Sequence, residues 1–172
     1  MNHIKLNKCP STQDYLKHLV EKCPDVLKKD VLVTSLDQTK GRGRSANRWK
    51  SFENSIAMSF LIEAQEKKTL TPIYIGVMIS KYLSSRYNKK LFLKRPNDIL
   101  NEKREKVGGV ICQLIEDRVI IGLGLNQVVE QKSPELPFAA GIFDLTENIE
   151  DPHQFASKFY KYLIDQNQEK IS

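Results

Sequence analysis

Two apolar runs joined by a tight turn constrain the fold of this chain more than any other feature. Residues 107–116, VGGVICQLIE, and residues 118–125, RVIIGLGL, are rich in Val, Ile and Leu, which is typical of buried strands. So short a link permits only an antiparallel hairpin, and we place its turn at Asp117 and Arg118. The sequence therefore predicts a β-sheet that contains this antiparallel pair.

The rest of the chain alternates further strands with helices. Apolar and β-branched runs predict strands over residues 30–36, 55–62 and 91–94. Helical spacing of apolar residues predicts helices over residues 11–21, 71–87 and 153–166. Ser11 and Thr71 are the expected N-caps of the first two helices. With 172 residues that are 40% hydrophobic, we expect one domain of α+β class, a mixed sheet flanked by helices.

Composition excludes several classes of protein. The first ten residues lack the apolar run of a signal peptide, and the longest mostly apolar stretch is too short to span a bilayer, so we expect a cytoplasmic protein. The cysteines and histidines are few and scattered: Cys9, Cys23, Cys112, His3, His18 and His153. This spacing predicts neither a disulfide framework nor a metal site. The net charge of +6 favours acidic partners in general and selects none of them.

Four short polar or glycine-rich segments lie at the ends of predicted strands. They are DQTKGRGRSANRW at 37–49, KRPND at 94–98, KVGGV at 106–110 and GLGLN at 122–126. Arginines between glycines, as at Arg42 and Arg44, are typical of turns that bind phosphate or carboxylate groups. Each segment alone also fits a solvated loop, an ordinary turn or a strand bulge. Four such strand ends in one small domain favour a binding site.

Together with STQ at 11–13, these segments resemble, in sequence order, the catalytic domain of the biotin protein ligases, over roughly residues 11–126. The resemblance implies the biotin and lipoate ligase fold, which is like that of class II aminoacyl-tRNA synthetases. Family enzymes join biotin to ATP as biotinyl-5′-AMP and then transfer biotin to one lysine of a biotin carboxyl carrier domain. It also implies Mg²⁺ with ATP, no DNA or membrane partner, and a monomer or a homodimer.

The resemblance assigns roles to individual residues. The catalytic residues would be Lys106, Arg44 and Asp98. The biotin-binding residues would be Ser11, Thr12, Gln38, Gly41, Arg42, Arg44, Lys106 and Gly109. The nucleotide-binding residues would be Arg48, Lys94, Asn97 and Asn126. No metal ligands are expected, Asp98 would position the acceptor lysine or Mg²⁺, and Trp49 is interpreted as a packing anchor for the loop.

The chain departs from the family pattern in several places. Arg95 stands where Trp is usual, and Ser45, Ala46 and Asn47 replace common loop residues. We expect residues 1–172 to form a single catalytic domain, without an N-terminal DNA-binding domain or a C-terminal β-barrel domain. The alternatives are a lipoate- or octanoate-type ligase and a biotin-binding homologue with reduced activity. A small nucleic-acid-binding module is a remote alternative, because Trp49 and Phe52 are the only aromatic residues in or beside the basic loop.

Overall fold

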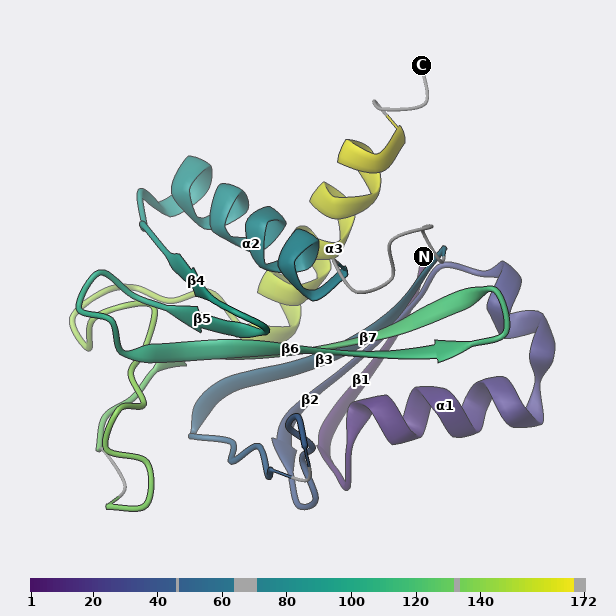
Figure 1. The fold of residues 1–172 in the computed structure, drawn as a ribbon, viewed down its shortest axis with the longest axis horizontal. Helices are drawn as coiled ribbons and strands as arrows, with labels where there is room; N and C mark the ends of the chain where they lie inside the picture. Colours follow the sequence, from purple (N-terminus) through teal and green to yellow (C-terminus); the bar gives the residue numbers. More distant parts are fainter. Residues whose placement is uncertain (46, 64–70, 132–133, 169–172) are drawn as a thin grey trace.

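One mixed sheet organises the computed structural model, which describes residues 1–45, 47–63, 71–131 and 134–168 (Figure 1). In this described part the strands are β1 Asn2–Cys9, β2 Val31–Gln38, β3 Asn54–Glu63, β4 Phe92–Lys94, β5 Asp98–Leu100, β6 Lys106–Ile115 and β7 Arg118–Val128. Their order across the sheet is β1-β2-β3-β7-β6-β5-β4. β1 and β2 are parallel, and the other neighbours are antiparallel.

Helices cover both faces of the sheet. They are α1 Thr12–Lys22, α2 Thr71–Tyr87 and α3 Pro152–Gln168, with a short 3-10 helix, η1, at Pro24–Lys28. Figure 1 shows α2 and α3 on one face and α1 on the other. The larger core lies under α2 and α3 and includes Phe60, Phe155 and Phe159, whereas Leu16 and Val20 of α1 belong to a smaller core. The predicted mixed sheet flanked by helices is confirmed.

The central hairpin is also confirmed, with one correction to its turn. Arg118 begins β7 and pairs with Ile115, so the two-residue turn consists of Glu116 and Asp117 rather than of Asp117 and Arg118. Glu116 has a positive φ of 50°. A positive φ at the first position of a two-residue turn matches the twist of the flanking strands.

Two strands, β1 and β5, were not predicted from the sequence, because each lacks a strong apolar pattern. β1, NHIKLNKC, lies at the edge of the sheet and, among the described strands, pairs only with β2, so it needs few buried side chains. β5 is only three residues long, yet it pairs Asp98 with Gly109 of β6. Asp98 therefore stands at the start of a strand of the sheet, directly after the predicted turn.

A histidine pair joins β1 to the start of α3. The rings of His3 and His153 contact the hydroxyl of Thr34 at 2.8 Å and 2.6 Å from their Nε2 and Nδ1 atoms, respectively. Burial is the main cause that lowers the pKa of both histidines, and Lys5 lowers both further while Asp151 opposes it. The folded protein therefore favours the neutral form of both rings.

We expect the stability of the protein to fall as pH falls below about 6.5, the ordinary pKa of histidine. The unfolded chain takes up these protons first, so this contribution to the free energy of unfolding is full above that pH and is lost toward the lowered folded pKa. Urea unfolding between about pH 8 and pH 5 measures the slope. His153→Gln should flatten the slope, because it removes one of the two groups whose pKa is lowered in the folded protein. An identical slope in the wild type and His153→Gln would contradict the prediction.

Candidate functional site

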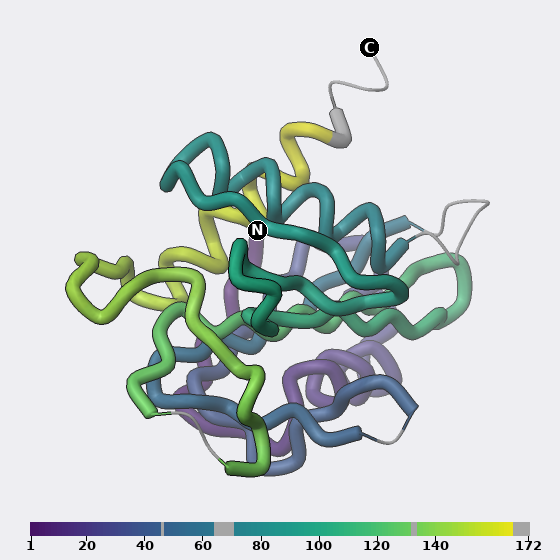
Figure 2. The backbone as a smooth tube through the Cα atoms, turned by 60° about the vertical axis from the view of Figure 1, so that its left-hand side comes forward, coloured from purple at the N-terminus to yellow at the C-terminus, as the bar shows by residue number. Residues whose placement is uncertain are grey.

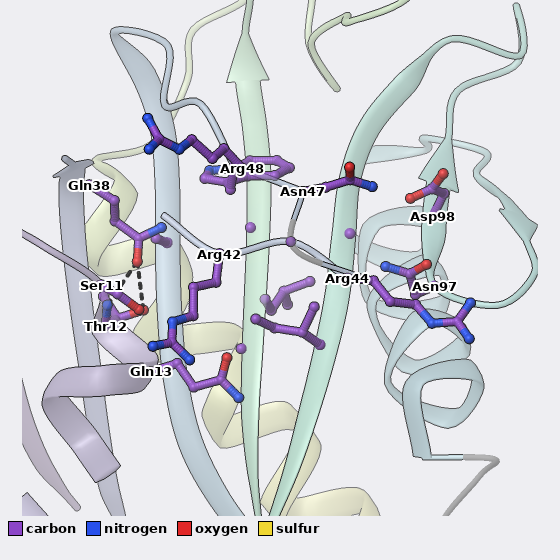
Figure 3. Close-up of a pocket in the computed structure, with 18 of the residues that line it drawn as sticks. Ser11, Thr12, Gln13, Gln38, Arg42, Arg44, Asn47, Arg48, Asn97 and Asp98 are labelled. Atoms are coloured by element: carbon purple, nitrogen blue, oxygen red, sulfur yellow. Dashed lines mark hydrogen bonds between the residues drawn. The ribbon is translucent and has the colours of Figure 1, made fainter. Parts of the chain in front are cut away.

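A cavity of about 250 Å³ lies between the first turn of α1, the loop after β2 and the middle of the sheet (Figure 3). Most of the predicted site residues line it: Ser11, Thr12, Gln38, Arg42, Arg44, Arg48, Asn97, Asp98, Lys106 and Gly109. They come from segments that are far apart in the sequence, and Figure 2 shows the loop after β2, in blue, beside α1, in purple. The sheet order is responsible, because it sets β2, β3, β7, β6 and β5 side by side.

Small residues form the floor of this cavity. Ala57 of β3 and Gly122 and Gly124 of β7 line it. The indole ring of Trp49 lies against Gly124, where a Cβ atom would come within 2.7 Å of Cε2 of the ring. Gly124 is therefore required for Trp49 to pack on the sheet, in keeping with its interpretation as a loop anchor.

We expect Gly124→Ala to displace the Trp49 ring, because the added methyl group and the indole cannot occupy the same space. Trp49 is the only tryptophan of the chain, so its fluorescence reports this change directly. The emission maximum should shift to longer wavelength as the ring becomes more exposed. Gly109→Ala is the matched control, because its Cβ would meet no atom closer than 3.6 Å. Identical spectra for the wild type and Gly124→Ala would show that the ring does not depend on this glycine.

A hydrogen-bonded polar wall closes the cavity beside α1. The side chain of Ser11 caps the helix by accepting from the backbone N–H of Asp14 at 3.2 Å. Oε1 of Gln38 accepts from the backbone N–H of Thr12 at 2.8 Å and from its hydroxyl at 3.2 Å. The Thr12 hydroxyl also lies 2.9 Å from that of Ser59. These bonds occupy the oxygen of the Gln38 amide and orient its NH₂ group as a donor.

An ion pair marks the opposite side of the cavity. Nζ of Lys106, at the start of β6, lies 2.6 Å from Oδ1 of Asp98, at the start of β5. The backbone of Lys106 is held as well, since its N–H donates to Phe138 O at 2.7 Å and its carbonyl accepts from Ala140 at 2.9 Å. A cation is thus fixed at the cavity wall with its charge only partly exposed.

A second cavity of about 260 Å³ adjoins the first, and Arg48, Trp49 and Lys106 line both. Its other walls are more apolar and include Phe52, Leu136, Pro137 and Phe138. Asn126 lies here, not in the first cavity. Its side chain accepts from Ser55 Oγ at 3.0 Å and donates to Ala140 O at 3.4 Å. The predicted nucleotide residues Arg48 and Asn126 therefore share a slot with aromatic and aliphatic walls.

Two predicted residues line neither cavity. Gly41 lies at the base of the loop, where its carbonyl accepts from Trp49 N–H at 3.0 Å and a Cβ would come within 2.6 Å of Trp49 O. It supports the loop from outside the cavity. Lys94 lines a separate small cavity under the start of α2, together with Pro72 and Gly76.

Sequence interpretation missed Gln13, which lies in the wall beside Thr12. Its side chain is 6% exposed, lines the first cavity and lies near Gly122 (Figure 3). A signal was present, because Gln13 shares the buried face of α1 with Leu16 and Val20. A glutamine on the apolar face of a helix needs a polar partner or a polar cavity.

The described residues contain neither a helix that could span a membrane nor a group of side chains that could bind a metal ion. None of the helices there combines the length and apolar character needed to cross a membrane. The same residues contain no group of three His, Cys, Asp or Glu side chains arranged to hold a metal ion. The cysteines are free, and burial raises the pKa of the Cys112 thiol to about 12.

Comparison with known proteins places this geometry in a family. The model of the Biotin/lipoate A/B protein ligase family matches residues 7–126. Two Arabidopsis thaliana proteins, Biotin–protein ligase 1, chloroplastic, and Biotin–protein ligase 2, are 30% identical over 128 and 134 residues. These matches cover 67% and 70% of this chain but only 34% and 39% of the relatives, so the chain spans little more than a third of their length.

Solved structures show the same fold. The biotin protein ligase from Aquifex aeolicus in complex with biotin and ATP superposes with a TM-score of 0.77 at 29% identity, over 98% of this chain and 71% of that one. The Leishmania major enzyme in complex with biotinyl-5-AMP gives 0.79 at 22% identity, over 98% and 75%, which is a likeness of fold alone. On this sequence match and this fold, the chain belongs to the Biotin/lipoate A/B protein ligase family.

Proposed function

We propose that the chain is the catalytic domain of a biotin protein ligase, which forms biotinyl-5′-AMP from biotin and ATP and transfers biotin to a lysine of a biotin carboxyl carrier domain. One observation carries the proposal. A polar cavity and a more apolar cavity meet at Lys106, whose ammonium is held by Asp98. This is the arrangement that two substrates need if a carboxylate of one is to attack a phosphate of the other.

The first cavity would hold biotin. The ureido ring is neutral and needs donors and acceptors rather than charge, which the Thr12 hydroxyl and the Gln38 NH₂ group supply. Ala57, Ile111 and Leu123 also line this cavity and would offer the thioether ring and the aliphatic chain an apolar surface. The biotin carboxylate would then reach toward Arg44 and Lys106. A dithiolane ring, as in lipoate, would leave the Gln38 NH₂ group without an acceptor, because the Gln38 oxygen and the Thr12 hydroxyl are already bonded to each other, so this wall favours biotin.

The second cavity would hold the adenine base. Arg48 and Trp49 offer flat or cationic surfaces for stacking, and Phe138 lies at the rim. Asn126 provides the one amide of this slot among the described residues. This assignment places the phosphates of ATP near Lys106, which lines both cavities.

In the first step, an oxygen of the biotin carboxylate attacks the α-phosphorus and the bond to pyrophosphate breaks. Arg44 and Lys106 would offset the negative charge of the reacting groups. Mg²⁺ would accompany the ATP phosphates and add to that neutralisation. Asp98 is the one carboxylate among the described residues that line the first cavity, so it is the residue that could face the ion.

In the second step, the amine of the acceptor lysine attacks the carbonyl carbon of the mixed anhydride, and AMP leaves. The amine must first lose its proton, which passes to solvent water, before it attacks. Asp98 would draw the acceptor ammonium to the reaction centre, since it already holds a lysine ammonium there. The carrier domain as partner, the cytoplasmic location, the single-domain organisation and the choice between monomer and homodimer remain predictions.

The decisive experiment measures pyrophosphate release from MgATP with biotin, lipoate or octanoate as the acid. If biotin is the only one of the three acids that supports release, the proposal is supported. If lipoate is the only one, the lipoate-type alternative is supported. Biotin binding without pyrophosphate release would indicate a homologue with reduced activity. Transfer is then measured on a carrier domain, with the Lys→Arg form of its acceptor site as the control.

A further inference from the structure

An ion pair holds the arginine-rich loop to helix α1. Nε of Arg42, in the loop after β2, lies 3.0 Å from Oδ2 of Asp14, in the first turn of α1. Figure 3 shows Arg42 extending from the loop toward Gln13 at the mouth of the first cavity. Among the described residues, no other ion pair joins this loop to α1.

Each partner of the ion pair is fixed to its own element. The backbone N–H of Asp14 donates to the Ser11 side chain, so its carboxylate is attached to the turn that forms the polar wall. On the loop side, Arg42 pairs with Arg48 as an isolated antiparallel bridge. Gly43 N–H donates to Asn47 O at 2.7 Å, and Trp49 N–H donates to Gly41 O at 3.0 Å. The loop is thus a small hairpin. Because Arg42 pairs with Arg48, an ion pair that fixes Arg42 also restrains the segment that carries Arg48 and Trp49.

We propose that Asp14 is a positioning residue that acts through Arg42: it keeps the hairpin carrying Arg44, Arg48 and Trp49 against the cavity and slows the escape of a bound ligand. Asp14 does not line the cavity, so it acts on the ligand only through the loop. The identity of the ligand rests on the proposed function, but the contact between loop and helix does not.

A purely structural role for Asp14 must be separated from this one. Asp14 is also the acidic residue in the first turn of α1, where a carboxylate complements the helix dipole. Loss of that contribution does not depend on Arg42. Loss of the Asp14–Arg42 ion pair, which we call the latch, does depend on Arg42. A double-mutant cycle between Asp14→Asn and Arg42→Gln therefore distinguishes the two roles.

The first measurement uses the ligand-free protein and follows amide hydrogen exchange of Gly43 and Trp49, whose N–H groups are bonded within the hairpin. Asp14→Asn should accelerate their exchange by up to about fivefold, the range for a partly exposed ion pair. It should add no acceleration in the Arg42→Gln background. Glu21→Gln, which removes a carboxylate from the other end of α1, should have no effect. Unchanged exchange in Asp14→Asn, or the same acceleration in both backgrounds, would overturn the proposal.

The second measurement separates binding from chemistry with biotin as the probe. Asp14→Asn should raise the Kd and the KM for biotin by up to about fivefold and leave kcat unchanged, because Lys106 and Asp98 are untouched. A lower kcat with an unchanged KM would contradict the latch. If the wild type binds no biotin while the exchange cycle behaves as expected, the proposed function fails and the latch stands. If the wild type binds biotin but the effects of the two substitutions on exchange are additive, the latch fails and the proposed function is unaffected.

Discussion

Replacing Lys106 with Ala is expected to slow biotin-dependent pyrophosphate release by about 10²- to 10³-fold, the usual cost of removing one charge-stabilising donor from a reaction centre. We expect so large an effect because Lys106 lines both cavities and its backbone is hydrogen-bonded to Phe138 and Ala140. The loss should appear mainly in kcat, because the charge matters most where negative charge develops in the transition state. Single-turnover assays of pyrophosphate release measure it.

Two control variants show whether the loss comes from the ammonium itself. Lys103→Ala removes an exposed lysine from the neighbouring turn and should leave the rate unchanged. Lys106→Ala also leaves Asp98 without its partner, so the double variant Lys106→Ala/Asp98→Asn is needed. If the double variant recovers the wild-type rate, the defect of the single variant was the unpaired carboxylate, and Lys106 is not catalytic.

Asp98→Asn completes the comparison between the two steps. We expect it to impair transfer to the acceptor lysine more than adenylate formation, because the amide cannot attract an ammonium as a carboxylate does. Transfer is measured from preformed biotinyl-5′-AMP to the carrier domain. Equal losses in both steps would assign Asp98 to holding Lys106 alone.

The site was predictable where its residues follow directly from strand ends. Lys106 opens an apolar run and Asp98 follows a turn, and the antiparallel neighbours β5 and β6 bring them to 2.6 Å. Gln38 was assigned by the resemblance alone, because the predicted strand ended at residue 36, whereas β2 continues to Gln38. In each case the periodicity of a strand determines where the side chain lies.

Contacts between segments that share no pattern were not predictable. Nothing in the spacing of Asp14 and Arg42 indicates that they meet, since the pair forms only when the loop folds back onto α1. The second cavity depends on residues 134–139, whose sequence shows no periodicity, and on their backbone pairing with Lys106. Edge strand β1 was missed for a related reason, because an edge strand can be polar.

Helix α3 lies outside residues 7–126, the part matched by the family model, yet its packing predicts that the domain cannot fold stably without it. Phe155 and Phe159 are fully buried, and their rings lie 5.7 Å and 5.6 Å from that of Tyr82 on α2. We therefore expect Phe159→Ala to lower the free energy of unfolding by about 3–5 kcal/mol, the cost of removing a buried aromatic ring and leaving a cavity.

Urea unfolding measures this loss, and two variants of the same helix calibrate it. Phe159→Leu keeps much of the buried volume and should cost less than Phe159→Ala, while Lys161→Ala, at an exposed position, should cost little. A loss below about 1 kcal/mol for Phe159→Ala would show that α3 is peripheral. Because α3 covers the face of the sheet opposite to α1 and the first cavity, pyrophosphate release per folded molecule should be unchanged (Figure 1). Phe159→Ala should therefore lower the free energy of unfolding without changing the activity of the folded molecules. If α3 shaped the site, the substitution would lower both.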